Sequence, residues 1–128
     1  MSMNQRDDFN ARTKDILAKR VCYHCSNPTC SRTTIGPHTQ EDKTTLVGVA
    51  AHITAASPGG PRFDENISSD ERQSFENGIW LCVNCSTIID KDPESYPKQL
   101  LERWKNEAEK NALEKLTGEK DIRDSAQV

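Results

Sequence analysis

The chain contains few apolar and few aromatic residues. Of its 128 residues, 34% are hydrophobic and 5% are aromatic. It has no run close to the roughly 18 apolar residues that a membrane span needs. The first fifteen residues, MSMNQRDDFNARTKD, are polar and lack the apolar core of a signal peptide, so we expect a cytoplasmic protein. A small chain with so thin a core is often stabilised by a metal ion or by disulfides.

Excess positive charge is also absent. The net charge is −3, with five basic residues against one acidic residue between positions 11 and 40. Between positions 64 and 94, eight acidic residues stand against two basic ones. Affinity for nucleic acid comes largely from neutralised phosphates, so this balance argues against tight, unaided binding to nucleic acid. The basic part could face phosphates and the acidic part a divalent cation, although charge runs are usually solvated surface.

The hydrophobic pattern predicts a small α+β protein. Residues 7–20 have helical spacing with Asp7 or Asp8 as the cap, 44–52 is typical of a strand, and 77–82 is typical of a turn followed by a second short strand. The segment between these strands is expected to be a loop with one helical turn capped by Ser68 or Ser69. Residues 33–43 are expected to form a loop, residues 84–92 a short helix limited by Pro93, and Pro97 to about Leu116 a long helix.

These elements suggest a division of the chain. We expect an N-terminal helix in residues 1–19, a core in 20–96, a helix packed on the core in 97–116, and a flexible tail or linker in 117–128.

Five cysteines provide the most specific local signal. Cys82 and Cys85 form a C-x-x-C motif at the end of a predicted strand, and Cys22, Cys25 and Cys30 lie upstream. Cytosolic thiols stay reduced, and two distant cysteine pairs are what a closed four-cysteine zinc site requires. The SNPT sequence between Cys25 and Cys30 favours a turn that brings both thiolates together. We therefore predict structural Zn²⁺ on Cys25, Cys30, Cys82 and Cys85, with Cys22 as the alternative to Cys30 and buried free thiols as the simpler interpretation.

A single histidine ends the first predicted strand. The sequence GVAAHITAASPGGPR runs from an apolar strand into a loop rich in glycine and proline, and His52 stands at the boundary. Imidazole suits general-base catalysis because its pKa lies near neutral pH, although a lone histidine after a strand is more often structural. Arg62, after the double glycine, could bind phosphate or pair with Asp64. Asn77–Gly78 is a common hairpin-turn dipeptide.

The order of these motifs resembles that of a nuclease family. The chain resembles the HNH endonucleases of the ββα-metal class in the order of its motifs. These motifs are a cysteine pair, a strand ending in HI, a GG loop, an asparagine before LCVNC, and a helix that follows. The resemblance covers roughly residues 20 to 105. AAHITAASPGGPR followed by NGIWLCVNC is similar to the nuclease modules of bacterial anti-phage effectors, including those that join an HNH domain to a SAVED sensor domain in CBASS systems.

The resemblance implies a ββα-metal fold stabilised by a structural zinc ion, in a protein that hydrolyses DNA. It implies that His52 is the general base that activates water, and that Asn77 braces the loop and orients the histidine. It also implies one catalytic divalent cation, Mg²⁺ or Mn²⁺. The chain departs from the family at two positions, since Ala51 and Ser86 stand where many members have metal ligands. Asp90 shares a helix face with Ser86 and is the main candidate ligand for the catalytic metal; Asp92 is a weaker one.

Two functions follow as expectations. The first is a metal-dependent endodeoxyribonuclease in antiviral defence. A sensor or oligomerising domain could follow this chain at its C-terminus, and the protein could be a homo-oligomer. The second, which the two missing ligands suggest, is a non-catalytic HNH-fold zinc module for nucleic-acid binding or assembly.

Overall fold

The computed structural model describes residues 6–118, which form an α+β fold with four α-helices and two small antiparallel sheets. In chain order the elements are α1 (Ala11–Arg20), β1 (Ile35–Pro37), β2 (Thr44–Leu46), β3 (Gly48–His52), α2 (Ser69–Arg72), the 3₁₀ turn η1 (Phe75–Asn77), β4 (Gly78–Cys82), α3 (Val83–Lys91) and α4 (Lys98–Thr117).

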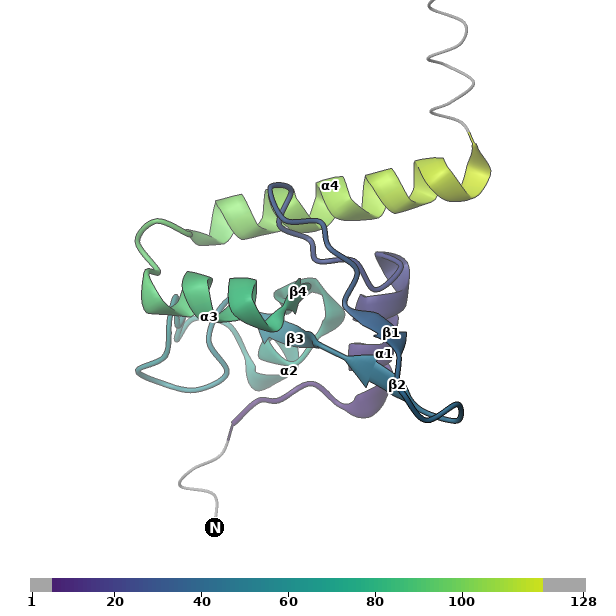
Figure 1. Cartoon of the computed structure of the whole chain (residues 1–128). Coiled ribbons are helices and arrows are strands. Elements are labelled where there is room, and N and C mark those ends of the chain that lie inside the picture. Colours follow the sequence, from purple (N-terminus) through teal and green to yellow (C-terminus); the bar gives the residue numbers. More distant parts are fainter. Residues whose placement is uncertain (1–5, 119–128) are drawn as a thin grey trace, which may run out of the picture.

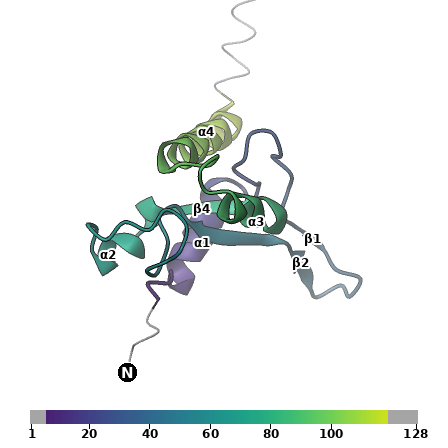
Figure 2. The same ribbon diagram turned by 90° about the vertical axis from the view of Figure 1, so that its left-hand side faces the viewer.

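The sheet of β3 and β4 forms the middle layer of the fold. The two strands are antiparallel, with Gly48 opposite Cys82 at one end and His52 opposite Gly78 at the other. Helix α1 covers one face, and α3 and α4 lie on the opposite face (Figures 1 and 2). The second sheet, made of β1 and β2, extends to one side of these layers (Figure 2).

Strand β4 is buried along its whole length, and the side chains of residues 79–81 alternate between two apolar clusters. Ile79 and Leu81 belong to the main core, which also contains Ile89 from α3 and Leu101 and Trp104 from α4. Trp80 points the other way and packs against Ala18 and Val21, at the end of α1. This two-sided burial explains why the strand sequence GIWLC is a continuous apolar run.

The predicted cap of the first helix is wrong. Asn10 caps α1, since its side chain accepts a hydrogen bond of 2.8 Å from the backbone N–H of Thr13. Asp7 is instead buried, and its carboxylate lies 3.4 Å from the guanidinium of Arg72. The intervening Phe9 packs into the protein, so the chain reaches the helix three residues later than Asp7 would require.

The predicted strand over residues 44–52 is interrupted. Val47 separates β2 from β3: its N–H donates to the carbonyl of Thr34 (2.7 Å), and its carbonyl accepts from the N–H of Val83 (3.0 Å). Strand β2 pairs with β1, which lies in the segment 33–43 that was expected to be a loop. Three residues without regular apolar alternation are too short a strand for a sequence pattern to indicate.

Several local predictions are confirmed. Ser68 caps α2 in a capping box with Glu71. Helix α3 ends before Pro93, and α4 begins after Pro97. Helix α4 ends at Thr117, followed by Gly118 with a φ of 74°; residues 119–128 of the expected tail lie outside the described part of the chain.

The hairpin turn expected at Asn77–Gly78 is wrong. Asn77 ends η1, and Gly78 begins β4 in extended conformation. Glycine suits this position because a Cβ atom would lie 2.5 Å from Cδ1 of Leu17, so a larger residue would force the Leu17 side chain to move. In residues 6–118 no helix has the length and apolar character needed to cross a membrane.

Candidate functional site

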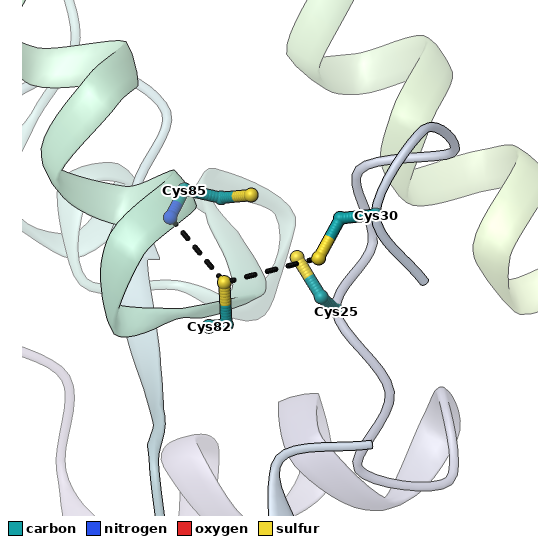
Figure 3. Close-up of side chains that lie close together, drawn as sticks. All are labelled: Cys25, Cys30, Cys82 and Cys85. Atoms are coloured by element: carbon teal, nitrogen blue, oxygen red, sulfur yellow. Dashed lines mark hydrogen bonds between the residues drawn. The ribbon is translucent and has the colours of Figure 1, made fainter. Parts of the chain in front are cut away.

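Four cysteines from two distant segments meet in one cluster. Cys25 and Cys30 come from the loop after α1, and Cys82 and Cys85 from the junction of β4 and α3 (Figure 3). All four sulfur atoms lie within 4.8 Å of one another, and those of Cys30 and Cys82 are 4.0 Å apart. Zinc–sulfur bonds of about 2.3 Å in a tetrahedron imply sulfur–sulfur distances of about 3.8 Å. The cluster could therefore hold a metal ion such as zinc.

Local hydrogen bonds shape both halves of the cluster. The Asn27 carbonyl accepts from the N–H of Cys30 (2.9 Å), and the Asn27 Oδ1 accepts from the N–H of Thr29 (3.1 Å), which closes the turn expected from SNPT. The Asn27 amide nitrogen donates across to the sulfur of Cys85 at 3.5 Å. In the other half, the N–H of Cys85 donates to the Cys82 sulfur at 3.3 Å, as in a helix N-cap.

Burial and hydrogen bonds shift the pKa values of three of these thiols. Burial raises the pKa of Cys25 and the pKa of Cys85. Burial also acts on Cys30, but hydrogen bonds, the first from the backbone at Arg32, outweigh it and lower the pKa of that thiol. A divalent ion deprotonates the thiols that it binds, so metal binding would release protons. Cys22 is exposed and lies outside the cluster.

A cleft of about 320 Å³ lies along β3. Four consecutive strand residues line it, so the cleft follows the edge of the strand rather than one face of the sheet. It brings together His52 from β3 and Ser86 and Asp90 from α3, three of the positions that the sequence singled out. Arg6 and the loop residues Ser57, Gly60 and Pro61 also line this cleft.

The orientation of the His52 ring is defined by two contacts. Its Nε2 lies 2.8 Å from the backbone carbonyl of Asp7. A carbonyl only accepts, so Nε2 donates, and in the neutral imidazole the lone pair is on Nδ1. The ring of Phe9 stacks on the imidazole, with the centroids 4.0 Å apart and the planes at 12°. Burial lowers the pKa of His52, although the hydrogen bond to Asp7 acts in the opposite direction.

Asn77 is buried below the loop that follows His52. Its Oδ1 accepts from the N–H and the hydroxyl of Thr54, both at 3.0 Å. Its Nδ2 donates to the carbonyls of Thr54 (3.0 Å) and Arg72 (2.9 Å). Its own carbonyl accepts from the N–H of Ile53 at 2.8 Å. These bonds join the loop after β3 to the start of β4, and through it they fix the end of the strand that carries His52.

Asp90 forms an ion pair with Arg62. An Asp90 oxygen lies 3.0 Å from the guanidinium, and the side chain of Arg62 is 7% exposed against 49% for Asp90. Arg62 also donates to the carbonyls of Ile53 (2.7 Å) and Ile89 (3.0 Å), so it joins the loop after β3 to the end of α3. Its partner is therefore Asp90, not Asp64. Asp92 is exposed and is not among the residues that line the cleft.

The cleft offers few ligands for a second metal. Among residues 6–118, the four cysteines are the one group of three or more histidine, cysteine or acidic side chains arranged to hold an ion. Asp90 supplies the one carboxylate that lines the cleft, with the Ser86 hydroxyl beside it. Mg²⁺ is usually bound by one or two carboxylates, substrate phosphates and waters. Asp90, with the Ser86 hydroxyl beside it, could therefore supply only part of the oxygen ligands of a divalent cation.

Sequence reasoning missed Lys105 in α4. Its ammonium group donates to the carbonyls of Phe75 (2.9 Å) and Gly78 (2.6 Å) and lies 3.7 Å from the centre of the Phe75 ring. Burial lowers the pKa of Lys105 to about 8. The signal was present in the sequence, because Lys105 stands four residues after Leu101 on the apolar face of the helix.

No protein-family model matches the chain, and no curated protein sequence matches it.

Proposed function

We propose that the protein is a divalent-metal-dependent endonuclease of the HNH type that hydrolyses DNA phosphodiester bonds. The observation that supports this best is the cleft at the edge of β3, which gathers His52, Ser86 and Asp90 from a strand and from the helix α3. The antiparallel pair β3–β4 followed directly by α3 has the element order that the motif resemblance implies. The four-cysteine cluster at the start of α3 supports a structural zinc ion in the same fold.

His52 acts as the general base in this proposal. Its Nε2–H is engaged by the Asp7 carbonyl, so Nδ1 takes a proton from water. The water oxygen forms a bond to phosphorus, the bond from phosphorus to the leaving sugar oxygen breaks, and that oxygen takes a proton from solvent. The lowered pKa of His52 keeps the imidazole neutral, and therefore basic, near neutral pH.

Asp90 would hold the divalent cation, with Ser86 beside it. When bound, Mg²⁺ or Mn²⁺ supplies charge stabilisation for the phosphate and the leaving oxygen. Arg62 keeps Asp90 at the rim of the cleft by pairing with one of its oxygens. Asn77 is a positioning residue, since its hydrogen bonds fix the loop that follows His52.

The test is cleavage of supercoiled plasmid DNA by zinc-loaded protein with and without Mg²⁺ or Mn²⁺. His52→Ala should lower the cleavage rate by roughly 10²- to 10⁴-fold, the usual range for loss of a general base. His38→Ala is the matched control, because His38 is an exposed histidine at the β1–β2 turn. Asp90→Asn should be partly rescued by a higher Mn²⁺ concentration. Cleavage by His52→Ala at the parent rate would refute the proposed mechanism.

One observation favours a second function. The carboxylate of Asp90, which the catalytic metal needs, is already paired with Arg62. A zinc-stapled module that binds nucleic acid or assembles with a partner, without cleaving, would have the same cysteine cluster. Protein that binds DNA and retains zinc, yet cuts with neither Mg²⁺ nor Mn²⁺, would favour this alternative. A role in antiviral defence and control by a C-terminal sensor or oligomerising domain remain predictions from the resemblance.

A further inference from the structure

The segment before α1 contacts His52 although it lies far from it in sequence. The Asp7 carbonyl accepts the Nε2–H of His52 at 2.8 Å, and the Phe9 ring stacks on the imidazole at 4.0 Å between centroids. Both residues are buried, and Arg6, just before them, lines the same cleft as His52. The segment therefore covers one side of the imidazole and forms part of the cleft wall.

Three further contacts hold this segment in place. The Asp7 N–H donates to the carbonyl of Ala56 at 3.1 Å, in the loop after β3. The Asp7 carboxylate pairs with Arg72 at 3.4 Å, and both side chains are largely buried. Phe9 packs close to the position where Gly78 has no side chain, since a Cβ atom there would lie 3.1 Å from the Phe9 ring.

We propose that Asp7 and Phe9 are positioning residues for His52: the Asp7 carbonyl selects the Nε2–H tautomer, and the Phe9 ring fixes the plane of the imidazole. The Asp7–Arg72 ion pair keeps the carbonyl at the required place. This inference rests on the proposed function, because the tautomer matters to catalysis only when Nδ1 is the base. If the ring could rotate, it would present its protonated nitrogen to water for part of the time. The rate of base catalysis would fall by the fraction of time spent in that orientation.

Nitrogen-15 NMR of the imidazole rings tests the placement without any nuclease assay. The chain has three histidines, and the spectra of His24→Gln and His38→Gln assign the remaining signals to His52. In the parent protein, His52 should be a single Nε2–H tautomer with an unprotonated Nδ1. Phe9→Leu, which keeps an apolar side chain, should give a mixture of tautomers or exchange-broadened signals.

Two matched controls separate positioning from general loss of stability. Phe75→Leu removes a ring that contacts Arg20 and Lys105 rather than His52. Asp15→Asn removes the exposed ion pair between Asp15 and Lys19 on α1, and neither of these residues lines the cleft. If Phe9→Leu does not fold, Asp7→Asn serves as the test variant, because it weakens the ion pair and keeps the size of the side chain.

Cleavage kinetics give the second readout. Phe9→Leu and Asp7→Asn should lower kcat by about 10- to 100-fold with little change in KM, whereas both controls should keep the parent kcat. The inference is overturned if His52 of the parent protein carries its proton on Nδ1. It is also overturned if the test variants have the same His52 tautomer and the same kcat as their controls. A parent protein that shows the Nε2–H tautomer but cuts no DNA would refute the proposed function and leave the positioning of the ring established.

Discussion

Replacing Asn77 with alanine would remove four side-chain hydrogen bonds from the interior of the protein. Two are accepted from the N–H and hydroxyl of Thr54, and two are donated to the carbonyls of Thr54 and Arg72, all at 2.9 to 3.0 Å. At about 1 kcal/mol for each bond, with a range of about 0.5 to 1.5, the expected loss in the free energy of unfolding is about 4 kcal/mol. That is a large fraction of the roughly 5–15 kcal/mol by which small domains are stable.

Urea unfolding followed by circular dichroism, with zinc present in excess, would measure this loss. Asn66→Ala is the matched control, since Asn66 is exposed and its replacement should change stability by no more than about 0.5 kcal/mol. Asn77→Asp keeps the acceptor but turns the donor into an oxygen that faces two carbonyls, so it should be at least as destabilising at neutral pH. A loss below 1 kcal/mol for Asn77→Ala would refute the idea that these bonds hold the end of β3.

Three more predictions concern the cysteines, His52 and Lys105. Cys30→Ser should release the metal and unfold the protein. Cys22→Gly should retain the metal and raise the free energy of unfolding by about 1 kcal/mol, because φ at Cys22 is 54°, a conformation that glycine adopts more readily than other residues. Elemental analysis and thermal melts would check both variants. Because the pKa of His52 is lowered, the unfolded chain takes up that proton first. Stability should then fall as pH drops from about 6.5 through the folded pKa, and pH-dependent unfolding of His52→Gln should lack that component. Burial lowers the pKa of Lys105 to about 8 from 10.5, so the unfolded state holds the extra proton between these values. Unfolding measured from pH 8 to 10.5 should show the parent gaining up to about 3 kcal/mol relative to Lys105→Met, and a constant difference would contradict this.

The parts of the structure that sequence reasoning predicted depend on short-range constraints. The cysteine cluster followed from ligand spacing and from the turn between Cys25 and Cys30. Ser68 and Pro97 marked helix starts because a cap or a proline acts on the next few residues. His52, Ser86 and Asp90 could be expected near one another from the motif order, and the structure brings them to one cleft.

The parts that were missed depend on contacts between distant segments. Aspartate is a common helix cap, so the local sequence favoured Asp7 in that role. In the structure Asp7 instead pairs with Arg72, which is 65 positions away in the sequence. Asp90 reads as a free carboxylate on a helix, and only the folded loop places Arg62 beside it. Strand β1 has three residues and depends on pairing with β2, so its own sequence contains too little pattern to indicate a strand.

The register of β3 and β4 gives the cysteine cluster a second consequence. Gly48 pairs with Cys82 at the cluster end of β3, and His52 pairs with Gly78 at the other end, four residues or about 13 Å away. Helix α3 makes the same connection, since it begins beside Cys82 and carries Asp90 further along. Cys82 of the cluster therefore adjoins both elements, because it pairs with Gly48 of β3 and directly precedes α3. A metal ion held there would fix the spacing between His52 and Asp90 without touching either, so the structural and the catalytic parts of the proposal depend on the same two elements.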